Sequence, residues 1–281
     1  MSNGALIFAH NNASIDYTRL AVFAATRIKK FLNVPVSIVT DNRKWLDENF
    51  HLHPFDKIIE IQSEPSTQKL FYDGTMASKK LEWKNLSRNR AYDLTPYDRT
   101  LVVDSDYILG SSILKSAFEV DADFQIYQTS FDLAGWRDTA CFQRLNSYSI
   151  PFYWATAFVF EKNKVTAAFF DLITYIKSNW NYFKILYGID SATYRNDYAF
   201  SIAIHIMNGK TNGQFATPLP GTMTYIQDRD ILIEMKDDKF KFLVEKQSHL
   251  GQYLAVKTSG IDVHVMNKIS LLRVLEGDQV V

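Results

Sequence analysis

Apolar and polar residues alternate in blocks along the first hundred positions of the chain. Short apolar runs predict strands, and a longer stretch with apolar residues on one side predicts a helix. The order strand, helix, strand is the βαβ unit of nucleotide-binding sheets. The predicted elements are strands over 5–9, 36–39, 57–61 and 100–103, and a helix over 17–32. This pattern predicts an α/β protein with a mainly parallel sheet.

The helix over 17–32 has both a start signal and an apolar face. Asp16 precedes it, and an aspartate at this position can cap a helix by accepting a hydrogen bond from a backbone amide of the first turn. Its apolar stripe consists of Leu20, Phe23, Ala24, Ile28 and Phe31. We therefore expect this helix to pack against the sheet.

The rest of the chain continues the alternation. We expect strands over 124–127, 155–161, 231–234 and 240–244, and helices over 83–94, 165–186 and 197–207. Residues 62–80 are polar and mixed, so a loop with partial order is expected there. Aromatic residues cluster between 180 and 187, and we expect them in the core.

Composition limits the class of protein. With 47% hydrophobic and 14% aromatic residues among 281, the chain can bury a substantial core, which excludes global disorder. Its 31 basic and 31 acidic residues cancel, which argues against a protein that mainly coats nucleic acid. Cys141 is the single cysteine, so no intramolecular disulfide forms. The first residues lack a signal-peptide pattern and the longest apolar run, 153–160, is too short for a membrane span, so we expect a cytoplasmic protein.

Two carboxylates follow the strand over 100–103. Asp104 and Asp106 are separated by one serine and lie where the strand ends, and ligands bind at the carboxyl ends of strands in open α/β sheets. A turn would explain one aspartate, since aspartate is a poor strand former. Two of them favour a hard cation, Mg²⁺ or Mn²⁺, whose remaining ligands would be phosphate oxygens.

A second pair of this spacing, Asp121 and Asp123, precedes a predicted strand instead of following one. We interpret it as a solvated turn. No G-x-G-x-x-G follows the first strand, so a dinucleotide cofactor is not indicated.

The D-x-D block TLVVDSDYILG resembles the signature of GT-A fold glycosyltransferases, which use nucleotide-diphospho-sugars. Further stretches are similar to the same superfamily: the start of the helix at Asp16-Tyr17, the segment 83–97 with Arg88, the strand from Trp154, the stretch RNDYAFSIAIH with Asp197, and His264 with Lys268. The similarity spans most of the chain and is sharp only at the D-x-D. The combination is also reminiscent of glycosyltransferases encoded by bacteriophages, some of which glycosylate modified DNA bases.

The resemblance implies a single GT-A-like domain with a nucleotide-sugar-binding half over 1–110 and an acceptor-binding half over 111–281. It implies that Asp104, Asp106 and His264 hold the metal and that Lys268 neutralises the diphosphate. Other implied contacts to the donor involve Tyr17, Asp41, Arg88 and Asp104, and the implied acceptor-side catalytic residue is Asp197. No glycine lies between His264 and Lys268, which departs from the commoner H-x-x-G-x-x-K pattern.

Each of these residues has a structural alternative. Tyr17 can be a first-turn aromatic that packs on the sheet, and Asp41 can belong to a turn. Arg88 can be an exposed helix charge, Asp197 can cap the helix that follows it, and His264 can be a structural histidine. An imidazole ligand would favour Mn²⁺ over Mg²⁺.

The sequence thus predicts a metal-dependent hexosyl- or pentosyltransferase that uses a nucleoside-diphosphate sugar, most simply a UDP-sugar. One alternative is a sugar-phosphate nucleotidyltransferase, although the segment LIFAHNNAS lacks the Gly- and Arg-rich loop that such enzymes share. Another is a catalytically silent nucleotide-sugar-binding module. The acceptor is a hydroxyl that the sequence does not identify, and a modified base of phage DNA is one hypothesis.

Overall fold

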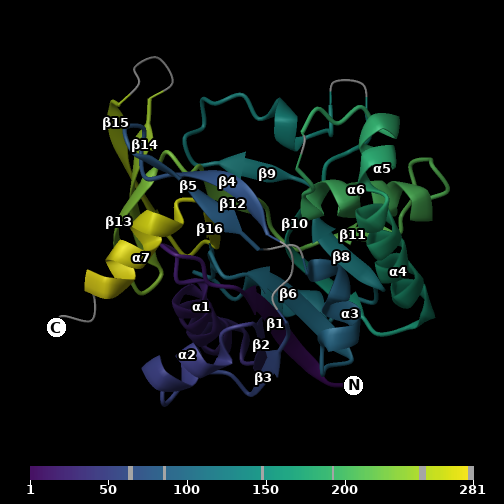
Figure 1. Cartoon of the computed structure of the whole chain (residues 1–281), viewed down its shortest axis with the longest axis horizontal. Coiled ribbons are helices and arrows are strands. Elements are labelled where there is room, and N and C mark those ends of the chain that lie inside the picture. The colour runs from purple at the N-terminus through teal and green to yellow at the C-terminus, as the bar shows by residue number, and fades with distance from the viewer. Residues whose placement is uncertain (63–65, 85–86, 147–148, 192, 247–250, 278–281) are drawn as a thin grey trace.

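The computed structural model describes residues 1–62, 66–84, 87–146, 149–191, 193–246 and 251–277. At its centre lies a seven-stranded sheet with the order β11-β8-β10-β6-β1-β2-β3 (Figure 1). Its strands are β1 (Asn3–Ala9), β2 (Val36–Thr40), β3 (Lys57–Glu60), β6 (Arg99–Asp104), β8 (Phe124–Tyr127), β10 (Trp154–Glu161) and β11 (Ala216–Pro218). Strands β3, β2, β1 and β6 run parallel, and β10 is antiparallel to both β6 and β8.

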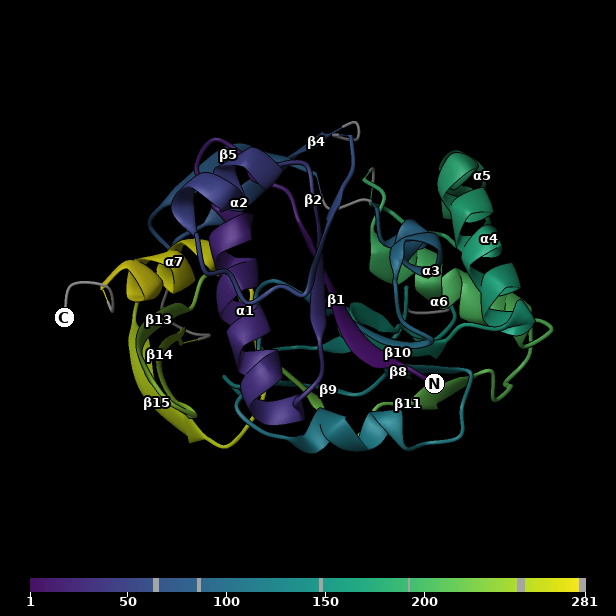
Figure 2. The same ribbon diagram turned by 90° about the horizontal axis from the view of Figure 1, so that it is seen from below.

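Strand β1 shows why helices cover both faces of this sheet. Successive side chains of a strand point to opposite faces. Ile7 belongs to one core with Leu20 and Ile28 of α1 (Tyr17–Leu32), whereas Leu6 belongs to a second core with α4 (Lys164–Ser178) and α6 (Asn196–Met207). Figure 2 shows α1 on one side of β1, with α4 and α6 on the other.

Three smaller sheets extend the domain. One contains β7 (Tyr107–Ile108), β16 (Val263–Val265), β12 (Met223–Ile226) and β9 (Ser130–Asp132); the second contains β13 (Ile231–Lys236), β14 (Lys239–Glu245) and β15 (Tyr253–Ser259); the third is the hairpin of β4 (Thr67–Tyr72) and β5 (Ser78–Trp83). Helix α7 (Lys268–Gly277) packs against β13, where the Ser270 hydroxyl accepts a hydrogen bond from the amide of Leu232 at 3.1 Å. Shorter helical segments are α2 (Arg43–Asn49), α3 (Ala91–Leu94), α5 (Trp180–Leu186), η1 (Arg88–Arg90), η2 (Ile113–Phe118) and η3 (Ala140–Phe142).

The predicted α/β fold with a mainly parallel sheet flanked by helices is confirmed, and the strongly periodic elements lie where the sequence placed them. Helix α1 spans the predicted residues, and the Asp16 side chain caps it by accepting from the amide of Arg19 at 2.9 Å. Among the described residues, no helix combines the length and apolar character needed to span a bilayer.

Two predictions around the β4–β5 hairpin need correction. Residues 67–72 form a strand instead of a loop. They pair with β5 in an antiparallel hairpin in which Phe71 and Leu81 are buried, and a turn at Gly74, with φ +71°, reverses the chain. The predicted helix over 83–94 starts too early: Trp83 ends β5, and helical structure begins at Arg88 and ends at Leu94 as predicted.

The predicted long helix over 165–186 is interrupted at Asn179. This residue ends α4 and precedes α5, with φ −114° and ψ 32°, and its side-chain amide donates to the carbonyl of Tyr175 at 2.9 Å. Asparagine favours such local hydrogen bonds over helix continuation. The aromatic cluster was expected in the core, yet Tyr182 is 64% exposed and Phe183 alone of the α5 residues is buried.

Gly110 permits the close approach that joins β7 to β16. A Cβ atom there would overlap the backbone carbonyl oxygen of Ile261. The carboxylate of Asp262 also accepts hydrogen bonds at 2.9 Å from the amides of Gly110 and Ser111. This contact fixes β16 beside β7.

We therefore expect Gly110→Ala to lower the free energy of unfolding by about 1–3 kcal/mol, because a backbone atom cannot move aside as a flexible side chain can. Urea-induced unfolding followed by circular dichroism measures this. The matched control is Gly277→Ala, where a Cβ meets no atom within 4 Å. If both variants unfold at the same urea concentration, the close approach at Gly110 does not contribute to the free energy of unfolding.

Candidate active site

The candidate site lies at the carboxyl edge of the parallel strands, where β6 ends. Asp104 is the last residue of β6 and is paired in register with Phe8 of β1. A two-residue turn then leads to β7, which begins at Tyr107. The turn places Asp106 beside the small sheet that contains β7 and β16, and Asp106 is buried there.

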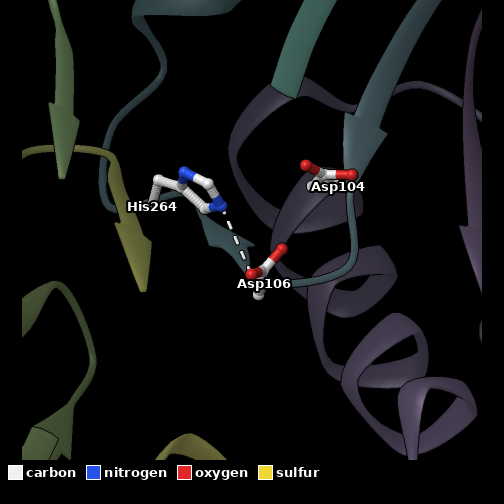
Figure 3. Close-up of side chains that lie close together, drawn as sticks. All are labelled: Asp104, Asp106 and His264. Carbon is white, nitrogen blue, oxygen red and sulfur yellow. Dashed lines mark ion pairs between the residues drawn. The ribbon is translucent and has the colours of Figure 1, made fainter. Parts of the chain in front are cut away.

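His264 reaches this turn because β16 pairs with β7. The two strands are antiparallel with His264 opposite Tyr107, and the amide of Val265 donates to the carbonyl of Asp106 at 2.9 Å. His264 Nε2 consequently lies 3.3 Å from Asp106 Oδ2 (Figure 3). One ligand atom from each of Asp104, Asp106 and His264 lies within 4.8 Å of the others.

Lys268 completes the surroundings of Asp106. It is the first residue of α7, and its Nζ lies 2.6 Å from Asp106 Oδ2. Burial alone would raise the pKa of Asp106, but Lys268 and His264 together hold it well below its usual range. Burial would lower the pKa of Lys268, whereas the charge of Asp106 raises it above its ordinary value. The carboxylate and the ammonium therefore both stay charged.

Asp104 is balanced by a different cation. Its carboxylate forms an ion pair with the guanidinium of Arg88, which also donates to the carbonyl of Ala155. The alternative in which Arg88 is an exposed helix charge is wrong, because the residue is 3% exposed and lies in the short helix η1. Burial lowers the pKa of Arg88 to about 10, so it stays protonated at neutral pH.

A cavity of about 380 Å³ opens in front of these groups. Tyr17, Trp154 and Asp197 line it together with the charged residues described above. The hydroxyl of Tyr17 is buried, and no hydrogen-bond partner for it exists among the described residues. Tyr17 both packs in the α1 core, as its structural alternative required, and presents its ring to the cavity.

Asp197 does not cap α6. The helix begins at Asn196, Arg195 is its N-cap, and Asp197 lies in the first turn, so the capping interpretation is wrong. Asp197 Oδ1 accepts from the amide of Ala155 at 3.0 Å, and Oδ2 lies 2.7 Å from Arg195 Nη2. These contacts hold the carboxylate at the wall of the cavity.

Asp41 is not among the residues that line the cavity, but it contacts two residues that are. His10 Nδ1 lies 3.2 Å from Asp41 Oδ1, and Lys84 Nζ lies 3.5 Å from Asp41 Oδ2. His10 and Lys84 themselves line the cavity. Asp41 thus orients residues that can contact a ligand. The His10 Nε2 atom is buried and has no hydrogen-bond partner within the described part of the chain.

The pair Asp121 and Asp123 lies apart from this site. Both side chains are exposed, and the Asp123 carboxylate accepts a hydrogen bond from the Asn163 side chain. The interpretation as a solvated turn agrees with this position.

Several cavity residues were not found from the sequence. His10, Lys69 and Asp228 belong to no motif of the sequence, and Trp83 only begins the stretch 83–97 that resembles the superfamily. Their shared signal is positional: His10 follows β1 at the same sheet edge as the D-x-D, whereas Lys69 and Trp83 depend on a hairpin that the polar sequence concealed.

The ligand set fits a divalent cation. Two carboxylates and one imidazole are oxygen and nitrogen donors of the kind that Mg²⁺ and Mn²⁺ accept. The imidazole of His264 also has its Nδ1 atom buried without a hydrogen-bond partner among the described residues. The pKa of Asp106 is held low by Lys268 and His264, and all three ligand residues line the same cavity, so a cation would meet preformed ligands.

Solved structures that resemble this chain include glycosyltransferases. GlyE of Streptococcus pneumoniae TIGR4 matches with 12% identity over 78% of this chain and 45% of its own length, at a TM-score of 0.45. The galactosyltransferase LgtC, solved in complex with donor and acceptor sugar analogs, matches with 16% identity over 71% of this chain and 70% of its own, at a TM-score of 0.45. The bifunctional IspDF from Campylobacter jejuni matches with 11% identity over 79% of this chain and 50% of its own, at a TM-score of 0.42.

No protein-family model matches this chain, and no curated protein matches it either. The chain spans less than half the length of GlyE. At these identities and TM-scores the solved structures assign neither a family nor a reaction to it. Its function must therefore be inferred from its own side chains.

The Asp106–Lys268 pair gives a prediction with a defined pH dependence. In Lys268→Met the buried carboxylate loses its main partner, so we expect the free energy of unfolding at pH 7 to fall by about 3 kcal/mol. In the wild type the pair stabilises the fold above about pH 4, the unfolded pKa of aspartate, and this contribution is lost as the pH falls through the lower folded pKa.

In the variant Lys268 no longer lowers the pKa of Asp106, so the stability lost relative to the wild type shrinks as the pH falls toward 4. Urea unfolding at pH 7 and pH 4 measures both effects. The double variant Asp106→Asn/Lys268→Met is the control, and it should be more stable at pH 7 than Lys268→Met alone. Equal deficits at the two pH values would contradict this account of the pair.

Proposed function

We propose that this protein is a metal-dependent glycosyltransferase that moves a hexosyl or pentosyl group from a nucleoside-diphosphate sugar, a UDP-sugar in the simplest case, to an acceptor hydroxyl. The observation that carries the proposal is the approach of Asp104, Asp106 and His264 ligand atoms to within 4.8 Å of one another, beside Lys268 in a cavity of about 380 Å³. This volume suits a small organic ligand.

Asp104, Asp106 and His264 would hold the cation, and the imidazole favours Mn²⁺ over Mg²⁺. When bound, the cation would act as a Lewis acid that neutralises charge on the leaving diphosphate. The chain supplies further positive charge itself. Lys268 and Arg88 are paired with Asp106 and Asp104. Both cations also line the cavity, so they can contact a phosphate that binds there.

The nucleoside would lie toward the end of β1. Tyr17 offers a ring face and a buried hydroxyl to a base or ribose. Asp41 would act through His10: with the Nδ1 hydrogen directed to Asp41, the Nε2 atom becomes a hydrogen-bond acceptor at the cavity. The resemblance implied that Asp41 contacts the donor; in this proposal His10 makes that contact and Asp41 orients His10.

The acceptor would enter beside Trp154 and Asp197. An indole ring and a carboxylate form a suitable surface for a sugar-like molecule, since the ring covers apolar C–H groups and the carboxylate accepts hydroxyl hydrogens. Asp197 Oδ2 would orient the attacking hydroxyl and take its proton after release from Arg195. The ion pair to Arg195 holds this carboxylate in place before the acceptor arrives.

Two rival functions receive less support. A nucleotidyltransferase needs a loop that grips a triphosphate, but the side chains of Asn11 and Asn12 are engaged with Asp16 and with the carbonyl of Glu82. A silent binding module has no use for two carboxylates and an imidazole held together in a cavity, because such charges cost free energy to bury.

The acceptor itself stays a prediction. A modified base of bacteriophage DNA follows from the resemblance in sequence alone, and the zero net charge of the chain opposes it. Binding to duplex DNA that falls steeply with salt concentration would support this acceptor, and its absence would exclude it.

The class of reaction is tested by hydrolysis of UDP-, GDP- and CMP-activated sugars, with Mn²⁺ and with EDTA. We expect slow metal-dependent turnover of one donor with water as acceptor, and a loss of at least a hundredfold in Asp106→Ala, because removal of a metal-binding carboxylate removes several kcal/mol of charge stabilisation.

The matched control is Asp123→Ala, which changes the exposed D-x-D and should leave turnover unchanged. Metal-dependent donor binding without turnover would agree with the proposed class of reaction and would mean that the enzyme needs its acceptor for turnover. Neither turnover nor metal-dependent binding of any donor would exclude the proposed function.

A further inference from the structure

Lys69 occupies an unusual position on strand β4. It pairs with Leu81 of β5, and alternation places it on the same face of the hairpin as Phe71. Phe71 and Leu81 are 5% and 6% exposed, so this face points into the protein. Lys69 is itself exposed, and it lies at the wall of the cavity.

The ammonium group of Lys69 has no anionic partner. It lies 5.6 Å from the ring centroids of both Phe71 and Trp83, which hold the side chain by cation–π contact. Within the described part of the chain it forms no ion pair or hydrogen bond. The other cations that line the cavity differ in this respect: Lys84, Arg88, Arg195 and Lys268 are each paired with a carboxylate.

Other charges of the cavity surround this ammonium. Loss of bulk water around the ammonium, followed by repulsion from Lys268 and Arg195, lowers the pKa of Lys69 to about 8. The residue as a whole is exposed. Asp228 and Asp106 act in the opposite direction. Crowded cations without a counter-charge are destabilised until an anion binds among them.

Asp228 does not supply that counter-charge directly. It lies between β12 and β13 and also lines the cavity, and burial raises the pKa of its carboxyl. Lys69 and Asp228 attract each other, yet they form no ion pair. Both residues line the cavity, so a ligand in it can contact Lys69.

We infer that Lys69 binds an anionic group of the substrate, namely the diphosphate of the nucleotide donor, so that the β4–β5 hairpin contributes a phosphate ligand independently of Lys268 on α7. This inference rests on the proposed function. A diphosphate brings negative charge to a cavity whose other cations already have carboxylate partners, and Lys69 is the described cavity cation with its charge still available.

The experiment measures binding of UDP with Mg²⁺ by calorimetry between pH 7 and pH 9. The wild type should lose up to about tenfold in affinity across this range, since Lys69 must be protonated to bind the anion. Lys69→Met should bind about tenfold more weakly at pH 7, the usual cost of one charge-assisted hydrogen bond, and should lack this pH dependence. Lys69→Arg should restore binding and keep it at pH 9.

Two further variants separate this role from a structural one. Lys80→Met lies on the same hairpin, but on the opposite face and outside the cavity lining, and should behave as the wild type. Asp228→Asn removes a charge that raises the pKa of Lys69, so it should shift the loss of affinity to lower pH.

The outcomes distinguish the two proposals. Metal-dependent UDP binding that is equally tight and equally pH-dependent in the wild type and Lys69→Met would overturn the role of Lys69 and leave the proposed function intact. If Lys69→Arg binds as weakly as Lys69→Met at pH 7, the hairpin has a packing role and the inference is also overturned. Absence of metal-dependent nucleotide binding in the wild type would overturn both.

Discussion

The buried carboxylate of Asp106 is the constraint on which the site depends. A charge at this depth is tolerated only when partners replace the lost water, and His264 and Lys268 provide them from more than a hundred and fifty positions further along the chain. The pairing of β7 with β16 delivers the histidine, and the start of α7 delivers the lysine. The C-terminal segment and the central sheet therefore have to assemble together before the cavity exists.

The same rule of compensation applies to other charges of the cavity. Asp104 has Arg88, Asp197 has Arg195, and these pairs are held by buried backbone contacts to Ala155. Such pairs contribute little net stability, because desolvation offsets most of their attraction. These pairs provide preorganisation. A bound anion can take the place of an aspartate beside its arginine, and a bound cation can take the place of the arginine, with little rearrangement of the surroundings.

The sequence predicted the parts of this arrangement that local patterns determine. Apolar runs predicted β1, β2 and β6, and the spacing of apolar residues predicted α1. Asp104 and Asp106 were identified because they follow the end of a predicted strand. The position of His264 came from a resemblance instead, since β16 has only three residues and no periodicity to detect. The resemblance also named Arg88, but its ion pair with Asp104 and its contact with Ala155 could not be predicted, because both partners are distant in sequence.

The segment that the sequence predicted least well contains residues of most interest for binding. In residues 66–84 lysines occupy positions 69 and 79, on the same face of the hairpin as Phe71 and Leu81, so the alternation of apolar and polar residues that marks a hairpin is broken in both strands. Local rules are broken at functional positions when a ligand supplies the compensation that the fold lacks. Lys69, a cavity cation without an ion pair among the described residues, fits this description, and the proposed diphosphate would supply its counter-charge.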